Sequence, residues 1–226
     1  MRLVTFNIRH GRGLDGRVDL RRTAAAIRHL DADVVCLQEV DRHFGARSGF
    51  ADQAAELGSL LDREVSYGAS LRRPGPGHRP REYGNAVLSR ARPSARRLVP
   101  LPGPPGAEPR TVLFVDLPDG STVGCTHLQQ DSAAARVGQV AALLAGMPPD
   151  RPVAVAGDWN AVPAAIELLP LAEELRDAGG GPTFPALFPQ RRLDRVWVRG
   201  WRPVHAVVSR SWASDHRPLS IDLQRD

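Results

Sequence analysis

The stretch RPVAVAGDWN (residues 151–160) is an apolar run that ends abruptly in polar and charged residues. DVVCLQEV (33–40) has the same design, a nearly continuous apolar run with Gln38 and Glu39 near its end. Continuous apolar runs without alternation are typical of strands that are buried on both faces. Because such strands carry their polar groups at the tip, the two stretches predict a covered sheet with one functional site at a shared edge.

The remaining chain intermixes strands and helices without repeats, low-complexity segments or a linker. Leu20, Ala24, Ile27 and Leu30 recur at helical spacing. Residues 72–82 (RRPGPGHRPRE) indicate an exposed basic loop. Strands are expected at 2–8, 84–90, 193–198, 203–209 and 217–223, with a hairpin of 111–117 and 121–128. Helices are expected at 19–30, 52–62, 131–145 and 165–175. Asp131 is a candidate N-cap of the third helix, and Pro170 is expected to interrupt the fourth. This pattern predicts one α/β domain, 1–226, with helices outside large sheets.

The composition is that of a soluble globular protein, with 42% apolar and 24% charged residues among 226. No apolar run approaches the roughly 18 residues of a membrane span, and the first residues show no signal-peptide pattern. We therefore expect a cytoplasmic location. Cys36 and Cys125 lie inside apolar stretches, which favours buried unpaired thiols over a disulfide.

The sequence contains no lysine, so its net charge of +5 comes from arginine. The abundance of Ala, Gly, Pro and Arg indicates a compositional bias, which weakens any inference from charge to nucleic-acid binding. The absence of lysine excludes a Walker-type phosphate loop, a Schiff-base enzyme and a Ser–Lys nucleophile pair.

Only three asparagines occur, and each has a distinctive place. Asn7 and Asn160 follow apolar strands, and Asn85 lies at a Gly turn. Each alone is more often a turn residue. In a chain so poor in asparagine, the shared placement favours a functional role.

Several potential metal ligands accompany the predicted strand ends. A hard divalent ion such as Mg²⁺ prefers carboxylate and amide oxygens, and substrate phosphate often completes its coordination. The lack of HExxH and of a cysteine cluster argues against tightly bound zinc, and the lack of GxSxG argues against a serine hydrolase. The candidates are Asn7, Glu39, Asp158, Asn160, Asp194 and Asp215 for oxygen, and His127 and His216 for imidazole nitrogen.

Taken singly, these residues also have ordinary structural interpretations. Asp215 fits a turn acid before a proline, and His127 fits a core histidine within a strand. Asp194 beside Arg195 fits a surface ion pair, which contributes little to stability. The other histidines are interpreted as surface or loop residues: His10, His29, His43, His78 and His205.

Six blocks occur in order over nearly the whole chain: LQEV (37–40), YGNAVLSR (83–90), THL (126–128), GDWN (157–160), RRLDRVWV (191–198) and SDHRPL (214–219). Together with the early Asn7 they resemble the endonuclease/exonuclease/phosphatase superfamily, which includes pancreatic deoxyribonuclease, abasic-site endonucleases, neutral sphingomyelinases and inositol-polyphosphate 5-phosphatases. The resemblance implies an α/β fold, a four-layer α/β sandwich of two packed mixed β-sheets flanked by helices. It also implies phosphoester hydrolysis that depends on Mg²⁺, with Mn²⁺ as the alternative ion.

The resemblance assigns three residues to the metal site. Glu39 in LQEV matches the main metal carboxylate, and Asn7 matches a neighbouring metal-site amide. Asp215 in SDH matches a further carboxylate at or beside the ion.

Two residues of GDWN match positions at the reaction centre. Asp158 matches the group that orients or deprotonates the attacking water, and Asn160 matches a residue that contacts the scissile phosphate.

Four further residues match positions around that phosphate. His216 matches the histidine that binds and polarises it, and Asp194 matches the acid that orients this histidine. The expected partner of His216 is therefore Asp194 and not its neighbour Asp215. His127 matches a second phosphate contact, and Asn85 matches a small polar position that lines the pocket.

The chain also departs from the superfamily pattern. Some nucleases carry an acid two residues after the early asparagine, where this chain has Arg9, so one-metal chemistry is expected. Arg195 follows Asp194 where many relatives have an aromatic residue. The segment RHFGARSGFADQ (42–53) resembles a subset of small bacterial hydrolases in the superfamily. Arg47 and Arg136 are candidates for binding substrate anions, and surface or interhelical ion pairs are the alternative.

The expected protein is a metal-dependent hydrolase of phosphodiester bonds and a monomer. Its substrate would be nucleic acid, favoured by the arginine-rich loops, or a small phosphodiester, favoured by the short chain. The alternatives are a lipid or inositol phosphate phosphoesterase and a non-catalytic protein that binds phosphorylated ligands.

Overall fold

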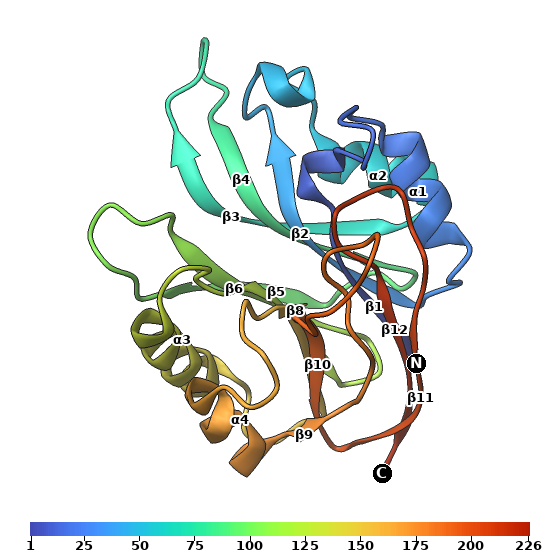
Figure 1. Ribbon diagram of the computed structural model, residues 1–226, viewed down its shortest axis with the longest axis vertical. Helices are drawn as coiled ribbons and strands as arrows, with labels where there is room; N and C mark the ends of the chain where they lie inside the picture. Colours follow the sequence, from blue (N-terminus) through green and yellow to red (C-terminus); the bar gives the residue numbers. More distant parts are fainter.

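The computed structural model describes residues 1–226 as twelve strands, four α-helices and three short 3₁₀ helices (Figure 1). One sheet contains β1 (Arg2–Asn7), β2 (Val34–Arg42), β3 (Glu64–Arg73), β4 (Arg81–Ser89), β11 (Trp201–Val208) and β12 (Leu219–Arg225). The other contains β5 (Ala95–Leu101), β6 (Arg110–Asp116), β7 (Thr122–His127), β8 (Val153–Asp158), β9 (Arg176–Asp177) and β10 (Asp194–Arg199). The helices are α1 (Leu20–Arg28), α2 (Gln53–Leu61), α3 (Ala133–Gly146), α4 (Leu169–Glu174), η1 (Arg9–Gly11), η2 (Ala46–Ser48) and η3 (Ile166–Leu168).

Two mixed sheets pack face to face. Their strand orders are β11-β12-β1-β2-β4-β3 and β5-β6-β7-β8-β10-β9. One adjacent pair in each sheet is parallel, β1 with β2 and β7 with β8, and the other pairs are antiparallel. In Figure 1, α1 and α2 cover the outer face of the first sheet, and α3 and α4 cover that of the second. The expected four-layer α/β sandwich is therefore confirmed.

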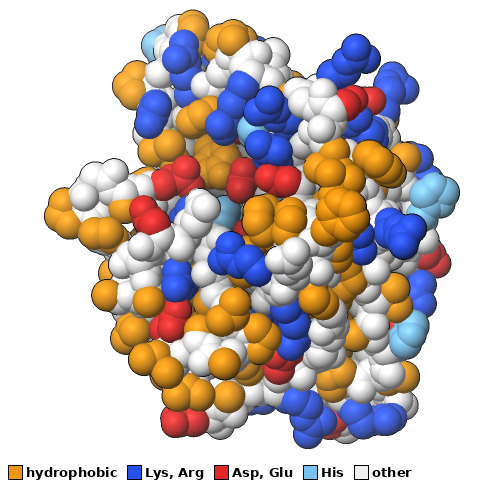
Figure 2. All heavy atoms as spheres, viewed as in Figure 1, with side chains coloured by type: hydrophobic (Ala, Val, Ile, Leu, Met, Phe, Trp, Pro, Cys, Tyr) orange, Lys and Arg blue, Asp and Glu red, His pale blue; other side chains and the backbone are white.

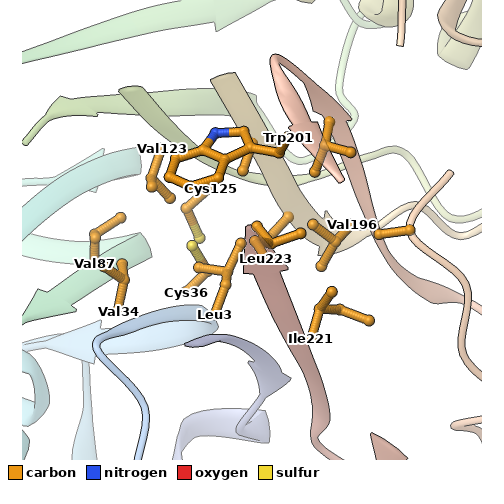
Figure 3. Close-up of a cluster of buried hydrophobic side chains, with 14 of the residues drawn as sticks. Leu3, Val34, Cys36, Val87, Val123, Cys125, Val196, Trp201, Ile221 and Leu223 are labelled. Carbon is orange, nitrogen blue, oxygen red and sulfur yellow. The ribbon is translucent and has the colours of Figure 1, made fainter. Parts of the chain in front are cut away.

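Three apolar layers account for the continuous apolar runs of the central strands. One core lies between the sheets, and two others lie between each sheet and its helices. Figure 3 shows the inter-sheet core, where Leu3 and Val87 of one sheet meet Val123 and Val196 of the other. Alternate residues of one strand thus face the opposite sheet or the helices, and both faces are buried.

The two cysteines face each other across this inter-sheet core (Figure 3). Both are buried and free, as expected. Burial raises the pKa of the Cys36 thiol, and the neighbouring Cys125 raises it further. The thiol of Cys36 is therefore protonated and inert in the folded protein.

Some elements differ from the sequence-based expectation. Ser132, not Asp131, caps α3, because its hydroxyl accepts a hydrogen bond from the Ala135 N–H at 3.1 Å. The expected loop at 72–82 forms the end of the hairpin between β3 and β4. β3, β5 and β9 were not expected. They lie at sheet edges, where exposed residues obscure the apolar pattern of a strand.

No helix has the length and apolar character needed to cross a bilayer.

Candidate active site

Three site residues lie in a row at one edge of the second sheet. His127 at the end of β7 is paired with Asp158 at the end of β8, and Asp158 is paired with Asp194 at the start of β10. In the facing sheet, Asn7 ends β1 and is paired with Gln38 of β2. Because the sheets pack face to face, residues far apart in sequence meet at this edge.

A β-bulge directs Glu39 toward the site. The register between β2 and β4 shifts between Leu37 and Val40, so that Gln38 and Glu39 oppose the single residue Asn85. Glu39 has φ +60°, a conformation that costs free energy for a residue other than glycine. Bulges commonly re-aim side chains next to active sites. This irregularity is invisible in the apolar run from which the strand is predicted.

Asn7 links two acids of the site, the partly buried Glu39 and the buried Asp158. Its Nδ2 donates to Glu39 Oε1 at 2.9 Å and to Asp158 Oδ2 at 3.1 Å. Its side-chain oxygen, Oδ1, accepts the Arg9 backbone N–H at 3.0 Å, and this contact fixes the orientation of the amide. The amide thus offers a donor to the two carboxylates, and the place of Asn7 at the metal site stays a prediction.

His216 and Asp194 form the expected pair. His216 Nδ1 lies 2.8 Å from Asp194 Oδ2, and both side chains are buried. The other nitrogen, Nε2, lies 3.6 Å from Asp158 Oδ2. The ring of Phe184 lies 4.8 Å from the imidazole and packs against it. One ring nitrogen is therefore held by Asp194, and the other faces the acid of β8.

The two site histidines carry different charges. Burial lowers the pKa of His216, but the negative charges of Asp194 and Asp158 outweigh it and raise the pKa to about 10. Burial is also the main influence on His127, and with the nearby Arg110 it lowers the pKa of His127 to about 3. At neutral pH the site thus contains a cationic imidazole and a neutral one.

This difference predicts how the histidines of the metal-free protein titrate. Neither His216 nor His127 should change charge between pH 5 and 8, although an unperturbed imidazole titrates near pH ~6.5. In Asp194→Asn the main charge that opposes desolvation is lost, so the pKa of His216 should fall from about 10. Nitrogen-15 NMR of the imidazole rings measures both. A His216 ring that titrates between pH 5 and 8 in the unmutated protein would contradict the assigned charge.

The raised pKa also determines how stability depends on pH. The folded protein retains the His216 proton up to about pH 10, whereas an unfolded histidine loses it near pH ~6.5. The contribution to the free energy of unfolding is therefore fully present below pH ~6.5 and is lost as the pH rises toward 10.

Asn160 joins the same cluster through a turn with φ +49°. Its backbone N–H donates to Asp158 Oδ1 at 3.0 Å. Its Nδ2 lies 3.0 Å from His127 Nε2 and donates to the Leu128 carbonyl at the same distance. The neutral His127 can accept this bond at Nε2, so it helps to fix the side chain of Asn160.

Asp215 and Asn85 lie at the borders of the cluster. Asp215 Oδ2 lies 3.2 Å from the Arg9 guanidinium, which partly offsets its charge. Asn85 is buried and donates to the Thr111 carbonyl at 3.1 Å. It opposes the bulge that carries Glu39, but its side chain makes no hydrogen bond to the other site residues.

The two candidate arginines have different environments. Arg47 forms a two-point ion pair with the buried Asp41, yet its side chain is 42% exposed, and its guanidinium lies 4.6 Å from the Phe44 ring centroid. Arg136 is buried, donates twice to Glu167, and also donates to the Gln129 and Gln130 carbonyls. These contacts support the interhelical ion-pair interpretation of Arg136 over a contact with substrate.

Arg136→Ala is expected to lower the free energy of unfolding by about 3 kcal/mol, because it leaves the buried Glu167 carboxylate without its cation. The double variant Arg136→Leu, Glu167→Leu should recover much of this loss. Urea unfolding measures the change. Equal stability of Arg136→Ala and the unmutated protein would contradict a structural role.

The arrangement of charges tests whether a cation fits the site. Elsewhere, buried acids pair with arginine: Asp41 with Arg47, Glu82 with Arg42 and Arg72, and Glu167 with Arg136. Glu39 and Asp158 have no arginine partner, and burial raises the pKa of Glu39. The cationic His216 lies near Asp158, but Glu39 has no ion-pair partner of its own, and a nearby positive charge stabilises a carboxylate in such a place. A divalent ion beside Glu39 fits this donor set.

A second group of potential ligands overlaps with this site. Ligand atoms of Asp158, Asp194 and His216 lie within 4.8 Å of one another. His216 is protonated at neutral pH, and its Nδ1 is held by Asp194. Metal binding at an imidazole requires a free lone pair. The carboxylate of Glu39 is therefore the better position for an ion.

Three residues near the site were not selected from the sequence as site residues. Arg9 pairs with Asp215, Phe184 packs on His216, and Arg110 lies near His127. Arg9 stands out only as a departure from the superfamily pattern. Nothing in the local sequence distinguishes Phe184 or Arg110, because their places depend on how distant loops and strands meet.

The fold and the site define a class of protein, a two-sheet α/β sandwich with an acid–imidazole cluster at the sheet edges. The pattern of the Endonuclease/Exonuclease/phosphatase family matches residues 4–216, so the chain belongs to this family of phosphoester hydrolases. A curated relative, the uncharacterized protein YbhP of Escherichia coli K12, is 32% identical over 250 residues, which cover 98% of this chain and 95% of YbhP.

Solved structures share the fold. An endonuclease/exonuclease/phosphatase from Beutenbergia cavernae matches with a TM-score of 0.83 and 30% identity, covering 100% of this chain and 71% of that one. The human Nocturnin catalytic domain with bound sulfate matches with a TM-score of 0.74 and 19% identity, covering 100% of this chain and 93% of Nocturnin.

Proposed function

We propose that this protein is a Mg²⁺-dependent phosphodiester hydrolase, with Mn²⁺ as an alternative ion. The observation that supports this most directly is that two carboxylates without arginine partners, the partly buried Glu39 and the buried Asp158, meet the cationic His216 at one sheet edge. Phosphodiester hydrolysis needs positive charge at the phosphate and a group that accepts a proton from water. This cluster contains groups suited to both tasks.

Asp158 is the proposed base. Its Oδ1 is held by the Asn160 N–H, and its Oδ2 is held by Asn7, so the carboxylate has a fixed orientation. It orients the attacking water and accepts a proton from it. Asn7 holds Glu39 and Asp158 together, and Glu39, with Asp215 nearby, would hold the metal ion. When bound there, Mg²⁺ supplies positive charge that offsets the charge of the phosphate.

His216 is the proposed phosphate contact. Asp194 holds Nδ1 and keeps the ring protonated, so the N–H at Nε2 is available to donate to a phosphate oxygen. Asn160 is a second contact at the phosphate, with neutral His127 fixing its side chain. His127 itself and Asn85 remain candidates for lining the phosphate pocket.

The charge around the site supports an anionic substrate. Figure 2 shows acidic side chains near the centre of the face in view. Many Arg side chains lie in the upper part of this view, which contains β3, β4, α1 and α2. Arg47 lies in this part of the protein and remains a proposed contact for substrate anions. Nucleic acid and small phosphodiesters both fit this charge. We also expect a monomer in the cytoplasm.

A substrate screen tests the proposal. Plain and abasic DNA, RNA, phospholipids and inositol phosphates are each incubated with the protein and Mg²⁺ or Mn²⁺, and with EDTA as the control. Metal-dependent hydrolysis of a diester is the expected result. A fall in activity as salt rises would favour nucleic acid over a small head group. Binding of phosphorylated ligands without turnover in every reaction would show a non-catalytic protein and contradict the proposal.

A further inference from the structure

A cavity of about 580 Å³ opens between the loop that precedes β10 and the loop that precedes β12. These loops lie next to each other in Figure 1. Half of the lining residues are hydrophobic and none is acidic. The lining includes Phe188, Gln190, Arg210, Ser211, Trp212 and Arg217.

The cavity shares its walls with the candidate active site. The Ala186 N–H donates to the Asp215 carbonyl at 2.7 Å, and the Arg217 N–H donates to the Thr183 carbonyl at 2.8 Å. Arg217 directly follows His216, and Ala186 lies two residues after Phe184, whose ring packs on His216. The cavity therefore lies beside the two loop segments that carry His216 and the ring packed on it.

Exposed aromatic rings on an anchored loop border this cavity. Trp212 is 68% exposed and Phe188 is 76% exposed. The backbone around Trp212 is fixed, because its carbonyl accepts the Leu14 N–H at 3.0 Å and the Ala213 N–H donates to Ser211 Oγ at 3.1 Å. Large aromatic side chains held in water on a fixed backbone are typical of ligand-binding surfaces.

The cavity also carries positive charge without a carboxylate partner. The Arg210 guanidinium makes no hydrogen bond or ion pair within the protein. Arg217 donates only to the Ala186 and Leu187 carbonyls. Two guanidinium charges beside a cavity that has no acidic lining residue favour an anionic ligand.

We propose that this cavity binds the nucleobase of a nucleotide whose phosphodiester is held at His216, so that the substrate is a single-stranded nucleic acid or a dinucleotide. This inference rests on the proposed phosphodiester hydrolysis. A base offers an aromatic face to Trp212 and polar edges to Gln190 and Ser211, and a neighbouring phosphate offers charge to Arg210. An acyl chain would leave these polar groups buried without partners.

The fluorescence of Trp212 reports on occupancy. The other tryptophans, Trp159, Trp197 and Trp201, are at most 5% exposed, so a stacked base quenches chiefly Trp212. The metal-free protein is titrated in EDTA with the thymidine dinucleotide dTpdT, with inorganic phosphate, and with phosphatidylglycerol vesicles. Saturable quenching by dTpdT alone is the expected result.

Variants then locate the site by calorimetry. Trp212→Ala should weaken dTpdT binding by about 10-fold, the scale of one lost base–aromatic stack, and Trp212→Phe should restore most of it. Arg210→Ala should also weaken dTpdT binding. The exposed Val204 on β11 and the exposed Arg92 supply the matched controls Val204→Ala and Arg92→Ala, which should bind as the unmutated protein does.

Unquenched fluorescence, or equal affinity of Trp212→Ala and the unmutated protein for dTpdT, would overturn the inference. Vesicle binding that is lost in Trp212→Ala, without dTpdT binding, would identify a membrane contact and overturn it too. Because binding is measured without metal or turnover, its failure is distinct from failure of the proposed function. If the protein hydrolyses diesters but its cavity does not bind dTpdT, the proposed base site is refuted and the proposed hydrolase function is not.

Discussion

Asp158→Asn is expected to lower kcat for phosphodiester hydrolysis by about 10³-fold, because the amide cannot accept a proton from the attacking water. The substitution keeps the shape of the side chain and an oxygen for the Asn160 N–H. It also lowers the pKa of His216, because the charge of Asp158 helps to raise the pKa of that imidazole. Stopped assays with bis(p-nitrophenyl) phosphate and Mg²⁺ measure the rate.

An acid outside the site provides the control for this prediction. Asp119 lies in the turn between β6 and β7, and Asp119→Asn also removes one negative charge. It should retain the unmutated rate. Thermal unfolding of both variants establishes that they are folded. Undiminished turnover in folded Asp158→Asn would exclude Asp158 as the base.

His216→Ala is expected to lower kcat by about 10²- to 10³-fold, which is the effect of removing one donor to a charged transition state. Its loss also leaves the buried Asp194 carboxylate without its partner, so some loss of stability is expected. Initial rates at saturating substrate separate the effect on kcat from weaker binding. A folded variant with full activity would remove His216 from the proposed mechanism.

The proposed dependence of His216 on Asp194 can be measured separately. If Asp194 acts by holding and charging the imidazole, then Asp194→Asn should lose little further activity once His216 is alanine. The double variant should therefore resemble His216→Ala. A multiplicative loss in the double variant would show that Asp194 acts on the substrate directly.

The fold could be predicted from the sequence because its central strands are buried on both faces. Apolar runs such as 33–40 and 151–160 identify such strands, and their polar tips mark the edge where the site lies. The edge strands β3 and β5 could not be predicted in this way. Their side chains are largely exposed or mixed, so the apolar pattern that marks a buried strand is missing.

The pairing of His216 with Asp194 was predicted from the resemblance and is present in the structure. The orientation of the Asn7 amide was not predictable, because it depends on a hydrogen bond from Arg9 that only the folded loop provides. The bulge at Glu39 likewise depends on strand register. Arg136 could not be separated from a substrate contact until its buried partner Glu167 was located. Residue patterns therefore do not predict those features of the site that depend on contacts between segments distant in sequence.

The metal requirement tests the central claim, hydrolysis of a phosphodiester at the Glu39–Asp158–His216 cluster, most directly. The protein is treated with EDTA, and initial rates on bis(p-nitrophenyl) phosphate are recorded as Mg²⁺ is added back, for the unmutated chain and for Glu39→Gln. We predict no turnover without Mg²⁺ and saturable recovery of the rate in the unmutated chain. In Glu39→Gln, the Mg²⁺ concentration that gives half of the maximal rate should be about 10-fold higher. Full turnover in EDTA, or identical Mg²⁺ curves for the two proteins, would contradict the account.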